Sequence, residues 1–247
     1  MDEMLYIAMT GAKQTEYAQA INSNNLANAS TTGFRADLHS FSSIPIAGPG
    51  VETRVNAVVE SYGTDYSQGA VAHTGRDLDV AVQGRGFIAV QAPDGSEAYT
   101  RAGDLRVEPG GLLTTGGGHL VLGDGGPVAI PPHASLLIGV DGTITIQAPD
   151  QGPETLSIID RIKLVDPDIT SMEKGVDGLL HMREGEAAPP ANARVQLTSG
   201  ALEQSNVNVA KTLVNMIELA RQYEMQVNVM KTTQENADTA AQMMRLG

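Results

Sequence analysis

Residues that could perform acid–base or metal chemistry are few and scattered in this sequence. Asp77 and Asp79 alternate in the segment RDLDV. Carboxylates two positions apart share one face of a strand, so the pair could act as a general acid and base, although a solvated strand face explains it as well. On the predicted helices, no histidine pairs with another histidine or with a carboxylate three or four residues away, and ligands that only the fold brings together would not show in such spacing. The histidines are His39, His73, His119, His133 and His181.

A glycine-rich run, GGLLTTGGGHLVLGDGG (110–126), is the second candidate for chemistry. A phosphate-binding loop needs a strand, the glycine loop and then a helix. Here the glycines separate short strand-like runs, and no Lys-Ser or Lys-Thr pair follows. GxSxG and HExxH motifs are also absent from the sequence. We interpret the run as turns and expect no catalytic residue, no metal site and no cofactor.

A cluster of asparagines in NSNNLANASTTGFR (22–35) is the third candidate for a functional site. A buried asparagine is costly unless its amide is hydrogen-bonded, but when bonded across a helix interface it fixes the register. A frayed, solvated helix end is the alternative. We favour an amide-rich helix end that docks against other chains, with Gly33 letting the backbone turn away. The asparagines and leucine that share faces at helical spacing are Asn22, Asn25 and Leu26 on one face, and Asn24 and Asn28 on the next.

Helices are predicted at both ends of the chain. The C-terminal seam repeats every three or four residues, which is typical of a coiled coil, and Asn206 and Asn208 could cap its start. The N-terminal seam is weaker because its centre is polar, and that helix should end near Ala29. The C-terminal seam is Val209, Leu213, Met216, Ala220, Tyr223, Val227, Met230, Gln234, Ala237, Ala241 and Met244. The N-terminal seam is Met1, Leu5, Ala8, Ala12, Thr15, Gln19, Asn22 and Leu26.

Neither helix could bury its seam alone, because isolated helices are marginal in water. The two helices therefore pair with each other, with other subunits, or both. Eight of the ten methionines fall in these helices. Methionine fills irregular gaps, which suits an ordinary helix core and suits better a surface that packs against several different neighbours.

The middle of the chain has the period-two pattern of strands, with most of the glycines. The sequence therefore predicts an α+β fold, in which N- and C-terminal helices pair in a coiled-coil-like layer around an inserted all-β domain of many short strands. The expected divisions are an N-terminal helix (1–30), an extended connector that is partly strand (31–75), a β-rich domain (76–200) and a C-terminal helix (201–247). Turns are expected at Pro93-Asp94-Gly95 and at the Asp-Gly pair of LLIGVDGTITI (136–146), which is predicted to be a hairpin. The other strand-like segments include VNAVVES (55–61) in the connector, LDVAVQGRGFIAVQ (78–91), LRVEPGGLLTT (105–115), HLVLGDGGPVAI (119–130), LSIIDRIKLVD (156–166) and ARVQLTS (193–199).

Charge and composition exclude several classes of function. The net charge is −13, and residues 31–202 hold eleven Lys and Arg against 21 Asp and Glu. Such a chain repels phosphate, so we expect no nucleic-acid partner. There is no apolar run long enough for a transmembrane helix, and the start MDEMLYIAMTGAKQ does not read as a secretory signal. Cysteine is absent, which excludes disulfides and thiol chemistry.

Three segments resemble the flagellar axial proteins, the rod and hook family. NNLANASTTGFR (24–35) resembles the N-terminal signature of that family, and SNVNVAKTLVNMIELARQYEMQ (205–226) is similar to its C-terminal segment. GRDLDVAVQGRGFIAVQ (75–91), followed by YTRAGDLRV (99–107), resembles the β-domain entry of the longer members. The segments keep the family order. Arg85, in QGRGF, departs from the acidic or neutral residue that the family often has there.

The resemblance implies a structural subunit of the flagellar proximal rod that transmits torque from the motor to the distal rod and hook. It implies terminal helices that form the inner tube of a helical assembly and order when they bind. The implied partners are other rod proteins, further copies of the chain and the type III export apparatus, and the implied location is the periplasmic rod, reached without a cleaved signal peptide. A distal rod protein, or in another class a stalked β domain that binds a sugar or small molecule, is the alternative.

Subunit contacts are expected along the two predicted seams and in the two terminal family segments. These positions are Leu5, Ala8, Ala12, Asn24, Asn25, Leu26, Asn28, Gly33, Phe34, Asn206, Asn208, Leu213, Met216, Ala220, Tyr223, Val227 and Met230.

Overall fold

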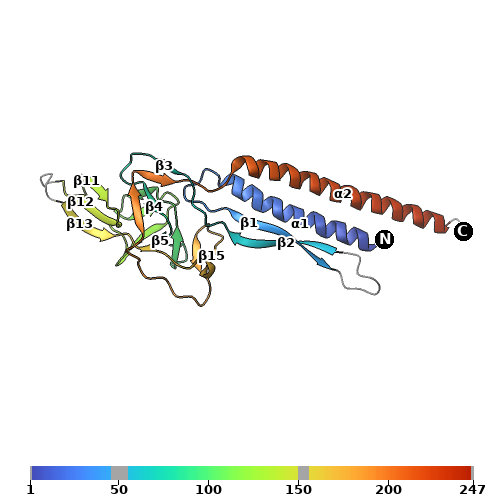
Figure 1. Ribbon diagram of the computed structural model, residues 1–247, viewed down its shortest axis with the longest axis horizontal. Helices are drawn as coiled ribbons and strands as arrows, with labels where there is room; N and C mark the ends of the chain where they lie inside the picture. The colour runs from blue at the N-terminus through green and yellow to red at the C-terminus, as the bar shows by residue number, and fades with distance from the viewer. Residues whose placement is uncertain (1, 46–54, 150–155, 246–247) are drawn as a thin grey trace. The chain divides into compact units, whose positions relative to one another are not determined.

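The computed structural model describes residues 2–45, 55–149 and 156–245. The chain divides into two compact units, which are described separately. The first, the helical unit, comprises Met1–Ala29, Asp37–Gly63 and Val207–Gly247. The second, the β unit, comprises Ser30–Ala36 and Thr64–Asn206. Helices at the two ends of the chain and many short strands between them confirm the predicted α+β class (Figure 1).

Two long helices make up most of the helical unit. They are α1 (Asp2–Ala27) and α2 (Val209–Arg245), which pack along each other (Figure 1). The unit also contains a two-stranded sheet of β1 (Asp37–Pro45) and β2 (Val55–Thr64). Both strands lie in the segment predicted to be an extended, partly strand-forming connector.

The helix boundaries follow local hydrogen bonding. α1 ends at Ala27, two residues before the expected end, and the Ala29 amide donates to the Leu26 carbonyl at 3.2 Å, which tightens the last turn. At the start of α2, the Asn208 Oδ1 accepts from the Lys211 amide at 3.0 Å, so Asn208 is the expected N-cap. Asn206 caps nothing in α2 and instead contacts residues of the β unit. Its expected capping role is therefore corrected.

The β unit consists of short strands joined by tight turns. A nine-stranded sheet, with the order β15-β16-β6-β5-β9-β8-β7 and with β10 on β9 and β14 on β5, is its largest described sheet. A three-stranded sheet β11-β12-β13 and the pairs β17-β4 and β18-β3 complete its described strands. The bounds are β3 (Val71–His73), β4 (Val80–Gln83), β5 (Phe87–Gln91), β6 (Glu97–Thr100), β7 (Leu105–Val107), β8 (Leu113–Thr115), β9 (Leu120–Gly123), β10 (Gly126–Pro127), β11 (Ser135–Ile138), β12 (Thr143–Gln147), β13 (Leu156–Arg161), β14 (Leu164–Val165), β15 (Met172–Lys174), β16 (Leu180–Met182), β17 (Gln196–Ser199) and β18 (Ala201–Glu203).

The turns agree with the sequence signals. At Pro93-Asp94-Gly95, the Gly95 amide donates to the Ala92 carbonyl at 2.9 Å, and β5 pairs with β6. At Asp141-Gly142, β11 pairs with β12 as predicted, and Gly142 has a positive φ of 83°. Left-handed backbone of this kind favours glycine, which explains the Asp-Gly sequence. The glycines of the 110–126 run lie in and around the turns that join β7 to β10, as the turn interpretation predicts.

Valine, isoleucine and leucine fill the interior of the β unit. The larger of its two clusters contains twenty buried hydrophobic residues, including Ile88, Val121 and Leu197, each with 0% of its surface exposed. A second cluster surrounds Tyr99 and Phe87. Strands that alternate or run apolar, as these do, are the pattern expected for sheets packed face to face.

The paired-carboxylate interpretation is wrong in its geometry. Asp77 lies in a turn, whereas Asp79 is buried in an isolated bridge and pairs with Arg76 at 3.2 Å. The two aspartates therefore do not share a strand face. Across the described residues, no cluster of three or more His, Cys, Asp or Glu side chains has a metal-binding arrangement. The helices in the described part of the chain include none that is both long and apolar enough to cross a membrane.

Candidate assembly surface

The two helices contact each other through small and polar side chains. The larger apolar Leu219 is the exception on α2, at 6% exposed. At Gly11, a Cβ atom would lie 3.0 Å from Cδ of Gln226, so glycine permits a close approach of α2 at that point. The buried residues of α1 are Ala8, Gly11, Ala12, Thr15, Ala18, Asn22 and Asn25, and those of α2 are Thr212, Leu219 and Thr233. We call these residues the inner stripes.

Two of the clustered asparagines are hydrogen-bonded within the helical unit. The Asn22 Nδ2 donates to the Thr212 carbonyl of α2 at 2.9 Å. Asn25 makes two bonds with Asp37 at the start of β1: its Nδ2 donates to the Asp37 carbonyl at 2.8 Å, and its Oδ1 accepts from the Asp37 amide at 2.8 Å. A buried amide satisfied in this way fixes how neighbouring segments pack. These two asparagines therefore set the internal register of the helical unit.

The other two asparagines of the cluster lie on a different face. Asn24 is exposed and Asn28 is half-buried. The Asn28 Nδ2 donates to the Asn24 carbonyl at 3.0 Å, one helical turn back. The cluster is thus divided between an inward pair that organises the chain itself and an outward pair on the surface of the helix end.

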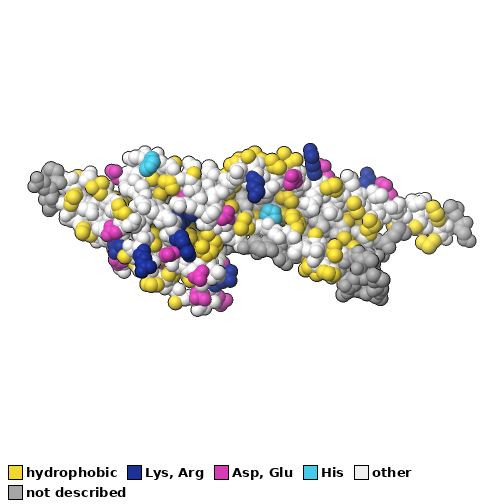
Figure 2. Space-filling view, in the orientation of Figure 1, with side chains coloured by type: hydrophobic (Ala, Val, Ile, Leu, Met, Phe, Trp, Pro, Cys, Tyr) yellow, Lys and Arg dark blue, Asp and Glu magenta, His cyan; other side chains and the backbone are white. Residues whose placement is uncertain are grey.

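Large hydrophobic side chains cover the outer face of both helices. Hydrophobic side chains gather along the helical unit between scattered charged ones (Figure 2). Monomeric proteins rarely expose so many large apolar residues together, and such patches mark interaction sites. The exposed large apolar residues of α1 are Met4, Leu5, Tyr6, Met9 and Tyr17, and those of α2 are Val209, Leu213, Val214, Ile217, Tyr223, Met225, Val227, Val229, Met243 and Met244. We call this set the outer face.

Five of the eleven residues of the predicted C-terminal seam belong to this outer face, and none belongs to the inner stripes. Leu213 is 45% exposed and Val227 is 39% exposed, whereas Thr212 is 7% exposed. The residues predicted to contact other subunits divide as follows: Ala8, Ala12, Asn25 and Gly33 are buried; Leu26, Asn28, Phe34, Asn206, Met216, Ala220 and Met230 are half-buried; Leu5, Asn24, Asn208, Leu213, Tyr223 and Val227 are exposed.

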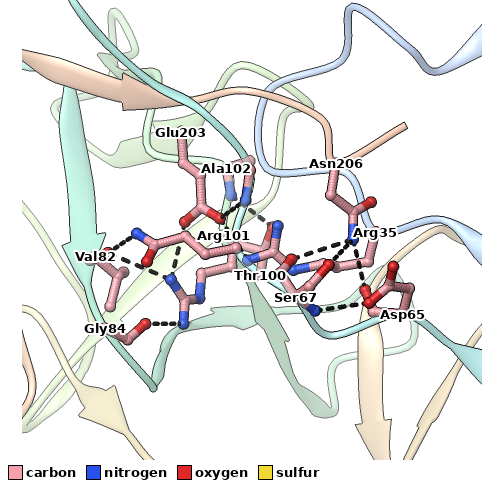
Figure 3. Close-up of polar contacts among 12 residues, drawn as sticks. Arg35, Asp65, Ser67, Val82, Gly84, Thr100, Arg101, Ala102, Glu203 and Asn206 are labelled. Atoms are coloured by element: carbon pink, nitrogen blue, oxygen red, sulfur yellow. Dashed lines mark hydrogen bonds and ion pairs between the residues drawn. The ribbon is translucent and has the colours of Figure 1, made fainter. Parts of the chain in front are cut away.

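A buried ionic cluster in the β unit contains further residues near the family segments. Glu203, 0% exposed, accepts from Arg35 Nη2 at 2.5 Å and from Arg101 Nη1 at 2.9 Å (Figure 3). Its Oε1 also accepts from the Gly69 amide at 2.9 Å. Arg101 donates in addition to the Gly84 carbonyl at 2.6 Å. Burial lowers the pKa of Arg101, and the Glu203 carboxylate counteracts that shift.

Gly33 and Phe34 are held beside this cluster. Gly33 has a φ of 68°, and a Cβ atom there would meet the backbone of Arg101 and Ala102, so only glycine fits. Its amide donates to the Glu203 carbonyl at 2.8 Å. The Lys174 Nζ lies 3.8 Å from the centre of the Phe34 ring and donates to the Arg35 carbonyl at 2.9 Å.

Asn206 links two other backbone segments of the β unit to its own. Its Oδ1 accepts from the Ala36 amide at 2.8 Å. Its Nδ2 donates to the carbonyl groups of Asp65 at 2.8 Å and Ser67 at 3.1 Å (Figure 3). An asparagine amide can donate and accept at once, which suits this bridging position.

Sequence reasoning did not select Arg35, Arg101 or Glu203. One signal was present: Arg35 directly follows the TTGF segment, and Glu203 lies two residues before SNVN. Opposite charges beside two family segments could have suggested an ion pair, but their sequence separation of 168 residues gave no spacing to support it.

Sequence comparisons place the chain among flagellar axial proteins. Residues 5–35 match the family described as flagella basal body rod protein, residues 81–146 match the flagellar hook protein FlgE/F/G D1 domain, and residues 198–243 match the flagellar basal body rod FlgEFG protein C-terminal family. The three matches follow the same order as the segments that suggested the resemblance.

Individual relatives align over nearly the whole chain. The flagellar basal-body rod protein FlgF of Escherichia coli (strain K12) is 39% identical over 100% of both chains. FlgF of Caulobacter vibrioides is 33% identical over 100% of this chain and 99% of its own. FlgG of Buchnera aphidicola subsp. Schizaphis graminum is 31% identical over 97% of this chain and 98% of its own. The chain belongs to the family of flagellar basal-body rod proteins.

Proposed function

We propose that the chain is a structural subunit of the bacterial flagellar proximal rod, which assembles helically and transmits torque from the motor to the distal rod and hook. The observation that carries this proposal is the outer face of α1 and α2, which exposes large apolar side chains in a chain that aligns end to end with rod proteins. Burial of this face against neighbours supplies the driving force for assembly. No catalytic role is part of the proposal.

The outer face and the asparagine pair at the end of α1 are the proposed subunit contacts. Leu213, Tyr223 and Val227 supply exposed apolar surface, and Asn24 supplies an exposed amide that can fix register between subunits. Residues of the set that are buried in one chain, such as Ala8 and Ala12, support the contacts by holding α1 close to α2. Partners are further copies of the chain and other rod proteins, with the type III export apparatus during secretion and the periplasmic rod as the location.

Electron microscopy of basal bodies from cells that lack the gene tests this proposal. Basal bodies that stop before the rod is complete, and that lack hook and filament, are the expected result. Complementation with the wild-type gene should restore them. Normal flagella on the deletion cells would refute the proposal.

A distal rod subunit is the second candidate, because a relative named FlgG also aligns over 97% of this chain at 31% identity. Immunogold labelling of purified basal bodies separates the two candidates. Label next to the motor ring supports the proximal rod, whereas label next to the hook supports the distal rod.

A further inference from the structure

The chain passes between its two units at four places, after residues 29, 36, 63 and 206. In the β unit, each passage leads directly into a short segment of the chain. These segments are 30–36, 64–69 and 203–206. All of them belong to the β unit, and none has the length to form a stable element alone.

Two side chains tie these segments together within the β unit. Glu203 binds Arg35 of the first segment and the Gly69 amide of the second. Asn206 binds the Ala36 amide of the first and the Asp65 carbonyl of the second. Arg101 anchors Glu203 to the sheet region through the Gly84 carbonyl. We call Arg35, Arg101, Glu203 and Asn206 the clasp.

Backbone contacts reinforce the clasp. The Asp65 amide donates to the Ala36 carbonyl at 2.8 Å, and the Gly33 amide donates to the Glu203 carbonyl at 2.8 Å. At Gly69, a Cβ atom would meet the Gln204 carbonyl, so the second and third segments lie against each other closely enough to require glycine. The three segments therefore form one packed, hydrogen-bonded group.

Hydrophobic burial alone does not explain this arrangement. A buried ion pair is a weak source of net stability, because desolvation offsets the attraction between the charges, yet its geometry is highly specific. Glu203, Arg35 and Arg101 are 0%, 3% and 4% exposed, and the Arg101 guanidinium lies over the Phe87 ring of the second cluster, 5.1 Å from its centre. Such a group is suited to fixing where segments lie rather than to increasing the total stability.

We propose that Arg35, Arg101, Glu203 and Asn206 are positioning residues that hold all four chain passages at fixed points of the β unit. A force applied to the helical unit then enters the folded β unit through one ordered group rather than through loose connectors. This inference rests on the proposed function as a rod subunit for its mechanical meaning, but the ordering of the segments is testable without it.

Hydrogen exchange on the purified full-length chain tests the ordering. Glu203→Gln keeps the side-chain shape but removes the charge. In this variant we expect the amides of Gly33, Ala36, Asp65 and Gly69 to exchange roughly tenfold faster or more, while strand β5 of the core exchanges at the wild-type rate. Leu197→Ala, at a fully buried position of the core, is the control and should accelerate the core strands too. Equal acceleration of the segments and the core in Glu203→Gln would overturn the proposal.

A milder pair of variants covers the case in which Glu203→Gln fails to fold. Asn206→Ala removes bonds to the first and second segments, and Asn192→Ala is its matched control because Asn192 is also half-buried in the β unit. Only Asn206→Ala should accelerate exchange in 30–36 and 64–69. Wild-type exchange in those segments of Asn206→Ala would overturn the proposal.

Motility per assembled flagellum separates positioning from simple stabilisation. Deletion cells that carry the Asn206→Ala gene should build flagella in near-normal number. They should nevertheless swim more slowly in viscous medium than deletion cells that carry the Asn192→Ala gene. The other outcome is that the number of flagella falls in proportion to the melting temperature of the variant, while the swimming speed of cells with equal numbers of flagella is unchanged. In that case the clasp only stabilises the fold, and the proposal is wrong. Failure of the wild-type gene to restore motility would instead refute the proposed function, while the exchange result still decides whether the clasp orders the segments.

Discussion

The β unit buries mainly large apolar side chains, whereas the helical unit buries mainly small and polar ones. Among the described residues, the β unit has a cluster of twenty buried hydrophobic residues, whereas the cluster in the helical unit contains Ala18, Val59 and Leu219. In the helical unit the inner stripes are small or polar, and the large apolar residues are on the outer face. The β unit thus resembles a complete domain, and the helical unit resembles half of an interface.

This difference indicates where each unit obtains its stability. The stability of the β unit comes from apolar area removed from water inside one chain. A helix pair with small and amide contacts removes little apolar area, so most of its potential stabilisation lies on the face still exposed. The helical unit should therefore gain most when neighbours cover that face, as in the proposed rod.

Leu213→Asp should have the largest effect on rod assembly, because it places a charge in the outer face. Leu213 is 45% exposed, so we expect the free energy of unfolding of the isolated chain to change by only about 0.5 kcal/mol. Burying the new charge between subunits costs several kcal/mol, so rods should not form. Swimming in soft agar and counts of basal bodies measure the effect.

Leu137→Asp is the matched control for this experiment. Leu137 is 48% exposed in β11 of the β unit. Cells with Leu137→Asp should swim normally. Normal swimming of the Leu213→Asp cells would show that the outer face does not carry the assembly contacts.

Truncation of a buried side chain should cost more stability in the β unit than in the helical unit. Ile88→Ala, in the large cluster, should lower the free energy of unfolding by about 2–5 kcal/mol, and Leu219→Ala, in the small cluster, by about 2 kcal/mol, because sparse packing relaxes more easily around the lost volume. Urea unfolding followed by far-UV circular dichroism measures both. Equal losses would contradict the contrast between the units.

Asn25→Ala tests whether the inward asparagines hold the helical unit together. The variant leaves the Asp37 amide and carbonyl without their side-chain partner, so we expect the helical unit to lose about 1–3 kcal/mol. Asn24→Ala, on the exposed face one residue away, should change the free energy of unfolding by no more than about 0.5 kcal/mol. A larger loss in Asn24→Ala than in Asn25→Ala would reverse the assigned roles. Hydrogen exchange at the Asp37 amide reports the effect directly.

Asn208→Ala should lower the free energy of unfolding by a small amount. It removes the bond from the Lys211 amide at the start of α2, which costs about 1 kcal/mol for a typical N-cap. Asn208→Asp should keep most of that contribution, because aspartate accepts the same bond. Thermal unfolding of the two variants measures the difference, and an equal loss in both would show that the cap contributes nothing.

Local signals predicted much of the fold. The Asp-Gly turn at Asp141 and Gly142, the strand in VNAVVES and the two terminal helices each follow from short-range pattern, and the structure has all of them. The cap at Asn208 follows for the same reason, since it involves residues three apart. Such features depend on the spacing of neighbours along the chain, which a sequence displays directly.

Nonlocal pairing explains what the sequence did not predict. Asp77 and Asp79 do not share a strand face, because Asp77 lies in a turn before β4. Asn206 does not cap α2, because its side chain bonds the backbone of Ala36, Asp65 and Ser67, which lie next to it in space. The clasp joins Arg35, Arg101 and Glu203 across as many as 168 residues, with no period to reveal it. Each of these contacts depends on how distant segments meet.

The sequence by itself determined the fold class, the family and the helical periodicity, because composition, spacing and short segments carry that information. The tertiary structure decided which stripe of each helix faces its own chain. Both the Leu213 stripe and the Thr212 stripe repeat at coiled-coil spacing, and only the approach of α1, with its small residues and the Asn22 bond to Thr212, turns the polar stripe inward. The stripe that contains Leu213 then stays exposed, because α1 already packs against the other side of α2.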